Sequence, residues 1–364
     1  MNKTFYYYLF GIFILFILFI PFTGCRQKST DIGINLVDHK QLTVEEIVLS
    51  DLCESIQIIP LETSDSILIA TISSIKIEAG KLYVQASNGV FAFDANGRFL
   101  NEIGHKGRGP REYLYLYDIF PENDEIWLVD NYKVLKYAST GLFLQYFDIE
   151  RKGFIEYHHA EGDTFIGFIP DLGNRTSAVM LAFFNASGIV DSVLYNNPIR
   201  DGGGGTIVNY MRPHFEAQFI NYRDQLKYKF MFNDTTYRII NNKLYPDVVL
   251  HLGSGKANEK GRLEMSKQPP DIAGVIKGMD RVELLGESDR YLYYSINNAP
   301  LFYDKKEQKA HKWNFILPTD ERLDPEQSKK FVPIYIDKNG NLIGQTAPAS
   351  IEDNPVVVVA KLKR

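Results

Sequence analysis

A short unit of alternating apolar strands and tight turns recurs along this chain, and it restricts the folds that the chain can adopt. The first copy, KLYVQASNGVFAFDANGRFLNEIG (81–104), predicts three strands separated by turns at Ser87-Asn88-Gly89 and Asp94-Ala95-Asn96-Gly97. The second copy, DEIWLVDNYKVLKYASTGLFLQYFDI (124–149), repeats this order and places a glycine turn at Gly141. Because the period is two rather than 3.6, the sequence predicts an all-β protein.

Further copies follow at 163–195, 226–253 and 290–316, and a last, shorter copy covers 338–364. The last copy lacks an outermost strand, whereas SIQIIPLE (55–62) forms a strand without a partner ahead of the first copy. We therefore predict a six-bladed β-propeller that is closed by pairing of this N-terminal strand with the last blade, which removes the open sheet edge. Each blade would take about 53 residues, close to the ~40 to 50 of known propeller repeats.

The N-terminus resembles a bacterial lipoprotein signal. Lys3 precedes the apolar run FYYYLFGIFILFILFIPF, and Thr23 and Gly24 stand before Cys25 as the small residues of a lipobox do. We predict a signal peptide over 1–24, lipidation at Cys25, a tether or linker over 25–46 and the propeller over 47–364. The alternative is an uncleaved membrane anchor.

Composition narrows the functional classes. The formal net charge is −5, with 40 basic and 45 acidic residues, which argues against a nucleic-acid partner. Apart from Cys25, Cys53 is the only cysteine, so no intramolecular disulfide is predicted. The sequence around Cys53 shows neither a base nor an electropositive setting, so it does not indicate a catalytic thiol.

Several motifs together resemble a known family. The segments IIPLET, FDANGRFLNEIGHKGRGPREY and FNDTTYRIINNKLYP, with the lipobox, are similar to six-bladed β-propeller lipoproteins, related to NHL-repeat propellers, of Gram-negative gut bacteria. The chain departs from them at Arg111, where they carry glycine before Glu-Tyr. The resemblance implies a propeller in the cell envelope, lipid-anchored and facing either the periplasm or the cell surface, and it implies no established reaction.

The stretch GHKGRGPREY connects the first blade to the second, and we expect it at the mouth of the central channel. Its glycines and proline suit a tight connection, but the fold does not require its charged residues. These are candidate ligand-binding residues: His105, Lys106, Arg108 and Arg111. A phosphate-binding P-loop is not indicated, because a strand rather than a helix follows. The run Gly202 to Gly205 fails as a P-loop for the same reason.

Amide and acidic residues recur at the turn between the second and third strands of the blades. These further ligand-binding candidates are Asn88, Asp130, Asn131, Asn233, Asp234, Asn297 and Asn298, and Tyr132 beside Asn131 is a candidate as well. Their oxygen atoms would suit Ca²⁺ in the central channel, whereas the simpler interpretation is that Asn and Asp are favourable turn residues. Histidines do not recur at one blade position, although His105, His159 and His214 could converge on Zn²⁺.

Three functional hypotheses remain. The preferred one is a binding or scaffold protein whose polar mouth takes a glycan, a peptide or a partner protein, with no predicted cofactor and no assignable catalytic residue. The second is a metal-dependent hydrolase or lyase with Ca²⁺ or Zn²⁺ in the channel. The third is a structural component of an envelope complex, which predicts an exposed apolar patch.

Overall fold

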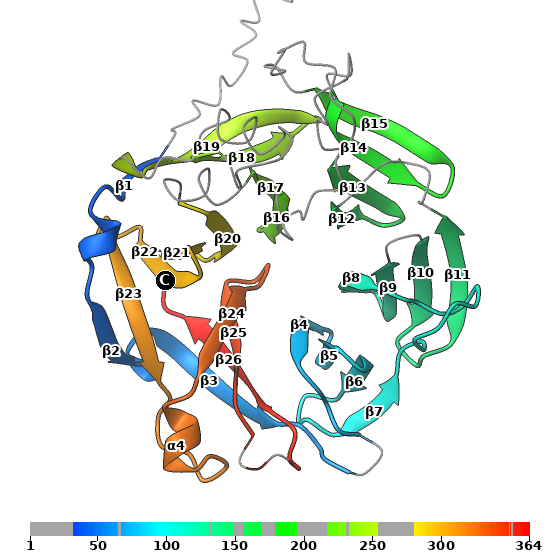
Figure 1. Cartoon of the computed structure of the whole chain (residues 1–364), viewed down its shortest axis with the longest axis horizontal. Coiled ribbons are helices and arrows are strands. Elements are labelled where there is room, and N and C mark those ends of the chain that lie inside the picture. Colours follow the sequence, from blue (N-terminus) through cyan, green and yellow to red (C-terminus); the bar gives the residue numbers. More distant parts are fainter. Residues whose placement is uncertain are drawn as a thin grey trace, which may run out of the picture. The chain divides into compact units, whose positions relative to one another are not determined.

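Six small sheets arranged in a ring form the protein (Figure 1), and this confirms the predicted six-bladed β-propeller. The computed structural model describes residues 32–64, 67–130, 133–148, 156–168, 179–194, 217–230, 233–253, 280–348, 350 and 352–364. In each blade four antiparallel strands run from an inner strand near the axis to an outer strand at the rim.

Blades 1 to 3 follow one another along the chain, each built from consecutive strands. Blade 1 consists of β4 (Ile72–Glu78), β5 (Lys81–Ala86), β6 (Gly89–Phe93) and β7 (Phe99–Glu102). Blade 2 consists of β8 (Leu116–Glu122), β9 (Glu125–Asp130), β10 (Lys133–Ala138) and β11 (Phe143–Asp148). Blade 3 consists of β12 (Glu156–Glu161), β13 (Thr164–Phe168), β14 (Val179–Asn185) and β15 (Gly188–Leu194).

The other three blades each include a strand from the N-terminal part of the chain. Blade 4 consists of β16 (Ala217–Tyr222), β17 (Gln225–Phe230), β18 (Thr235–Ile240), β19 (Lys243–His251) and β1 (Ile32–Asn35). Blade 5 consists of β20 (Val282–Glu287), β21 (Tyr291–Ile296), β22 (Ala299–Asp304), β23 (Lys309–Ile316) and β2 (Val44–Val48). Blade 6 consists of β24 (Val332–Ile336), β25 (Asn341–Thr346), β26 (Val356–Leu362) and β3 (Cys53–Pro60).

The ring closes in blade 6, where the two ends of the propeller sequence pair. β3 lies antiparallel beside β26, with Val358 opposite Ile58 and Ala360 opposite Ile56. Figure 1 shows this pairing as the blue strand beside the red one. The predicted closure is therefore confirmed, with the strand two residues earlier than the expected 55–62.

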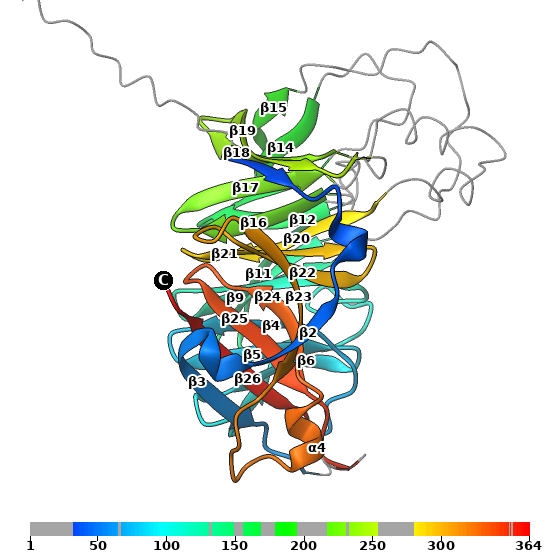
Figure 2. The ribbon, with the colours of Figure 1, turned by 90° about the vertical axis from the view of Figure 1, so that its left-hand side faces the viewer.

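Residues 32–51 follow the rim instead of serving only as a linker. β1 pairs in parallel with β19, and β2 pairs in parallel with β23, so each adds a fifth strand to its blade. The short 3-10 helix η1 (His39–Gln41) connects β1 to β2, and η2 (Leu49–Asp51) connects β2 to β3 (Figure 2). Much of the segment expected as a tether over 25–46 thus belongs to the propeller. The sequence alone does not indicate this, because strands of four and five residues carry little alternation.

Tight turns between the first two strands of several blades need left-handed backbone. Asn123 and Asp124 have φ values of 50° and 60°, and Arg223 and Asp224 have 46° and 58°. Two consecutive positive φ values are typical of type I′ turns, whose twist matches that of the flanking strands. One further helix, α4 (Pro325–Ser328), precedes blade 6 and is capped by Asp324. None of the helices in the described ranges is long and apolar enough to cross a membrane.

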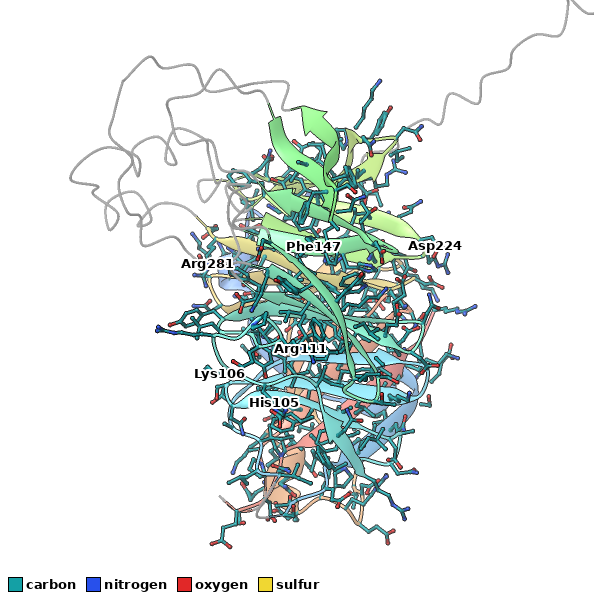
Figure 3. The ribbon with its side chains drawn as sticks, turned by 90° about the vertical axis from the view of Figure 1, so that its right-hand side faces the viewer. His105, Lys106, Arg111, Phe147, Asp224 and Arg281 are labelled. Atoms are coloured by element: carbon teal, nitrogen blue, oxygen red, sulfur yellow. The ribbon has the colours of Figure 1, made fainter. Side chains whose placement is uncertain are left out.

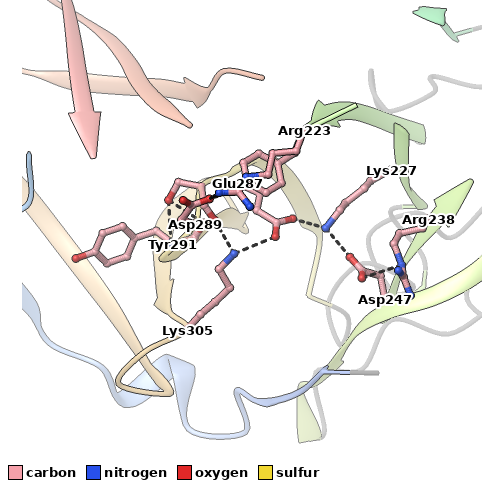
Figure 4. A network of polar contacts seen from close by, with 10 residues as sticks. Arg223, Lys227, Arg238, Asp247, Glu287, Asp289, Tyr291 and Lys305 are labelled. Carbon is pink, nitrogen blue, oxygen red and sulfur yellow. Dashed lines mark hydrogen bonds and ion pairs between the residues drawn. The ribbon is translucent and has the colours of Figure 1, made fainter. Parts of the chain in front are cut away.

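Apolar clusters and ion pairs hold neighbouring blades together. Between blades 1 and 2, for example, Tyr83 packs in one buried cluster with Leu128 and Tyr137. Between blades 4 and 5, the buried ammonium of Lys227 bridges Asp247, at 2.6 Å, and Glu287 (Figure 4). A buried charge is tolerated when it is paired in this way, so we interpret this network as structural.

Removing β26 should prevent folding. Deletion of Val356–Arg364 would expose the backbone edges of both β3 and β25, and such edges promote aggregation. We expect an insoluble product, whereas deletion of Arg364 alone should leave a soluble monomer. Size-exclusion chromatography and thermal melting would check this, and a soluble monomeric truncation with an unchanged Tm would contradict the closure.

Candidate functional site

One face of the ring, which we call the mouth face, is the face at which the inner strands begin. The connections from the preceding blade arrive there, beside the turns between the second and third strands. In Figure 3 the ring is seen from its side, with Lys106 and Arg281 toward one face and Asp224 toward the other. The ligand-binding candidates that lie within the described residues belong to these connections and turns.

Asn88 and Asp130 hold the incoming connections of their own blades. The Asn88 side chain accepts from the amide of Ala70 at 3.1 Å and donates to the carbonyl of Leu68 at 2.8 Å. The Asp130 carboxylate accepts from the amide of Tyr115 at 3.0 Å and from the amide of Leu114. Both side chains therefore satisfy backbone groups next to the inner strand.

Asn297 has the same role in blade 5. Its side chain accepts from the amide of Arg281 at 2.9 Å and donates to the Asp280 carboxylate at 2.8 Å. The guanidinium of Arg281 donates to Asn298 and lies 3.3 Å from the Glu283 carboxylate. Sequence analysis missed Arg281 and Glu283, because only the folded blade brings them beside this turn.

Asn233 and Asp234 make hydrogen bonds within blade 4. The Asn233 side chain accepts from the amide of Thr235 at 2.8 Å, and its backbone carbonyl accepts from the buried ammonium of Lys229. Burial lowers the pKa of Lys229 to about 7. Thr235 also donates to the Asp234 carboxylate at 3.1 Å. The simpler interpretation, favourable turn chemistry, thus accounts for the observed contacts of these residues.

The connection that carries His105, Lys106, Arg108 and Arg111 lies against the outer half of blade 2. Lys133 of β10 donates to the carbonyl of Gly109 at 2.6 Å, and Tyr137 of β10 donates to the carbonyl of Arg111. The Arg111 guanidinium lies 5.2 Å from the ring centre of Phe143 in β11. These contacts place residues 105–111 farther from the axis than the sequence analysis expected. Gly104, with a φ of 64°, permits the close approach to the Tyr137 hydroxyl.

Polar side chains gather midway along the inner strands, and the sequence analysis did not nominate them. Lys76 of β4 lies 3.0 Å from the Asp118 carboxylate of β8, which also accepts from the Ser74 hydroxyl at 3.1 Å. The Lys76 ammonium lies over the rings of Phe120 and Tyr335, at 5.5 and 5.4 Å. One lysine therefore links the inner strands of blades 6, 1 and 2.

His158 of β12 continues this set of contacts around the axis. Its ring stacks on Phe219 of β16, with centres 5.7 Å apart, and meets Phe120 edge-on at 5.1 Å. The Asn221 side chain lies 3.2 Å from its Nε2 atom. Burial, assisted by the positive charge of Lys76, lowers the pKa of His158 to about 3, so this imidazole is neutral at physiological pH.

The predicted histidine site can be placed only in part. His105 lies 3.4 Å from Glu102, and His159 lies 2.6 Å from the carbonyl of Gly162, so their described contacts are with different blades. Across the described ranges, no three His, Cys, Asp or Glu side chains are grouped so that they could hold a metal ion. Cys25, Asn131, Tyr132, His214 and the Gly202 to Gly205 run lie outside the described residues.

Exposed apolar and aromatic side chains stand at the start of two inner strands. Tyr115 and Tyr117, at the start of β8, are 59% and 36% exposed, and Val332 is exposed at the start of β24. Asp118 follows Tyr117 on β8 and pairs with Lys76 of the adjacent inner strand β4. The described mouth face thus combines aromatic surface at its edge with charged groups on adjacent inner strands, an arrangement typical of ligand sites.

This fold and site define a six-bladed β-propeller with a polar, aromatic-edged mouth. The chain belongs to the family described as a domain of unknown function, DUF4934, whose profile matches residues 32–361. No curated protein matches the sequence.

Solved structures from Bacteroides have a similar fold. One is a Bacteroides fragilis protein that is named as an exported protein. Its TM-score is 0.64 at 16% identity, and the match covers 92% of this chain and 100% of the Bacteroides fragilis chain. A member of the DUF4221 family from Bacteroides vulgatus has a TM-score of 0.49 at 12% identity, covering 86% and 98%. The first similarity supports the fold, and the second is too low to support more.

Substituting His158 should reduce the sensitivity of the fold to acid. Its pKa in the folded protein, about 3, lies below the ordinary value of 6.5, so the unfolded chain binds a proton that the folded protein excludes. The contribution of this pKa difference to the free energy of unfolding is complete above about pH 6.5 and is lost as the pH falls toward 3. Over this range the free energy of unfolding of the wild type should decrease with falling pH more steeply than that of His158→Gln. The difference in slope should reach up to about 1 kcal/mol per pH unit.

Urea unfolding between pH 7 and pH 4 would measure the effect. His105→Gln is the matched control, since the His105 side chain is 75% exposed, and it should follow the wild type. Parallel pH profiles for the wild type and His158→Gln would contradict the assignment.

Proposed function

We propose that this protein is an exported, lipid-anchored propeller that binds a ligand at its mouth face. The observation that carries the proposal is the pair of exposed tyrosines, Tyr115 and Tyr117, at the start of the inner strand β8, which also carries Asp118. Asp118 pairs with Lys76 of the neighbouring inner strand β4. Aromatic rings offer large contact area at low entropic cost, and a nearby charged pair can orient polar groups.

A glycan or a peptide suits this surface best. Both present apolar faces that pack on aromatic rings together with polar groups that need hydrogen-bond partners. The described mouth face supplies such partners in the exposed part of Arg281 and in Glu283. No reaction is part of the proposal, because no nucleophile with an adjacent base stands out on this face of the described chain.

The location rests on the N-terminal sequence and on the similar protein. The apolar run that ends in Thr23, Gly24 and Cys25 supports export and lipid attachment. The name of the similar Bacteroides fragilis protein is consistent with export. A lipid at Cys25 would hold the propeller at a membrane surface of the cell envelope.

Replacing both mouth tyrosines should abolish ligand binding without unfolding the ring. Glycan and peptide arrays probed with the labelled wild type would identify ligands, and Tyr115→Ser/Tyr117→Ser should bind them at least about tenfold more weakly. Tyr245→Ser, which changes an exposed tyrosine on the fourth strand of blade 4, β19, should bind as the wild type does. Full affinity in the double variant for a ligand of the wild type would move the site elsewhere.

Lipid attachment is tested separately. Cys25→Ala should remove incorporation of a labelled fatty acid and should release the protein from the membrane fraction, because no acceptor thiol would remain at the cleavage site. The matched control Cys53→Ala, at a buried thiol, should keep the label. Labelling that persists in Cys25→Ala would mean that the N-terminus is not a lipoprotein signal.

A further inference from the structure

The outer edge of blade 2 presents apolar side chains to solvent. Leu142 is 66% exposed, Leu144 is 42% exposed and Tyr146 is 44% exposed. We call these three residues the rim patch. Within the described ranges, β11 pairs with β10 on one side and with no strand on the other, so its outward backbone edge is open.

The fourth strand of blade 1, β7, is shorter than β11. β7 has four residues, whereas the fourth strand of blade 2, β11, has six and the fourth strand of blade 4, β19, has nine. The ring of Phe143 packs on Tyr137, with centres 5.5 Å apart, and lies 6.5 Å from Tyr146. After Ile103 the chain does not continue as a strand. It forms the connection that carries Lys106, Arg108 and Arg111.

One basic side chain, that of Arg111, borders the rim patch, and the same connection carries Lys106 and Arg108. Lys106, Arg108 and Arg111 are all exposed, and the Arg111 guanidinium lies over Phe143, the residue between Leu142 and Leu144. The nearby carboxylate of Glu112 is held by the amide of Gly109 at 2.7 Å. On a chain with a net charge of −5, this is a local positive surface beside an apolar one.

The same molecule shows what an outer strand of this fold accepts. β2, with the sequence VEEIV, pairs in parallel with β23 and thereby adds a fifth strand to blade 5. Its glutamates, Glu45 and Glu46, lie between valine and isoleucine, so an acidic and apolar segment is accommodated at a blade edge. β1 adds to β19 in the same direction.

We propose that the rim patch docks an extended acidic segment of a partner protein, which adds to β11 as β2 adds to β23. Backbone pairing along the open edge would supply affinity, the apolar side chains would pack on the rim patch, and acidic side chains would meet Lys106 and Arg108. The strand β11 lies at the rim, whereas Tyr115 and Tyr117 lie at the start of an inner strand. The propeller could therefore hold a partner protein at its rim while its mouth binds a ligand.

A peptide with the β2 sequence is a suitable probe. Fluorescein-labelled TVEEIVL, residues 43–49, is titrated with the full mature chain and followed by fluorescence anisotropy at low and high salt. We expect affinity that falls with salt and that drops about tenfold in Lys106→Glu/Arg108→Glu and in Leu142→Ser/Leu144→Ser. The control Lys329→Glu/Lys330→Glu reverses two exposed lysines ahead of blade 6 and should bind nearly as the wild type does.

Amide hydrogen exchange with the bound peptide locates the site. Protection should appear in β11 and not in β23, where the peptide would have to displace β2. Three results would overturn the proposal: equal affinity in the rim variants, protection at β23 alone, or no binding up to about 1 mM. A concentration-dependent dimer that Leu142→Ser/Leu144→Ser abolishes would instead make a second copy the occupant and would equally overturn it.

Discussion

Pairing between β3 and β26 is the interaction on which the rest of the structure depends. Each blade has two sheet faces that must be buried, and it can bury them only against the two neighbouring blades. An open ring would leave one face of blade 1 and one face of blade 6 in water. The register that places Ile58 opposite Val358 puts both ends of the chain into one sheet, and buried residues of blade 6 such as Val357 then pack in one cluster with Ile75 of blade 1.

The mouth and the rim both follow from this closed ring. Connections to the inner strands meet on one face, where Asn88, Asp130 and Asn297 hold their backbone in three different blades. That common role explains why amide and acidic residues recur at these turns. It also leaves the binding surface to side chains at the strand starts, such as Tyr115. At the rim, the outer strands of blades 4 and 5 gain a fifth strand, while β11 stays open in the described chain.

Sequence reasoning succeeds where the interaction is local and fails where it depends on convergence. Strand alternation and turn residues predict the blades, and the unpaired strand at 55–62 predicts closure. Both predictions use patterns among residues that are close together in the sequence. The contact between Lys76 and Asp118 joins positions 42 residues apart and depends on the relative position of two blades. The placement of Arg111 beside Phe143 depends in turn on how the connection after β7 packs on blade 2, whereas its glycines and proline mark only where the strand ends.

Amide hydrogen exchange of the ligand-free protein tests the closed ring most directly. If β3 is an integral strand of blade 6, peptides covering 53–60 and 356–362 should show equally strong protection and should lose it together as denaturant is added. Their protection should match that of the buried strand β5. Rapid exchange in β3 while β25 and β26 remain protected would show that the N-terminal strand detaches on its own, and it would contradict the account.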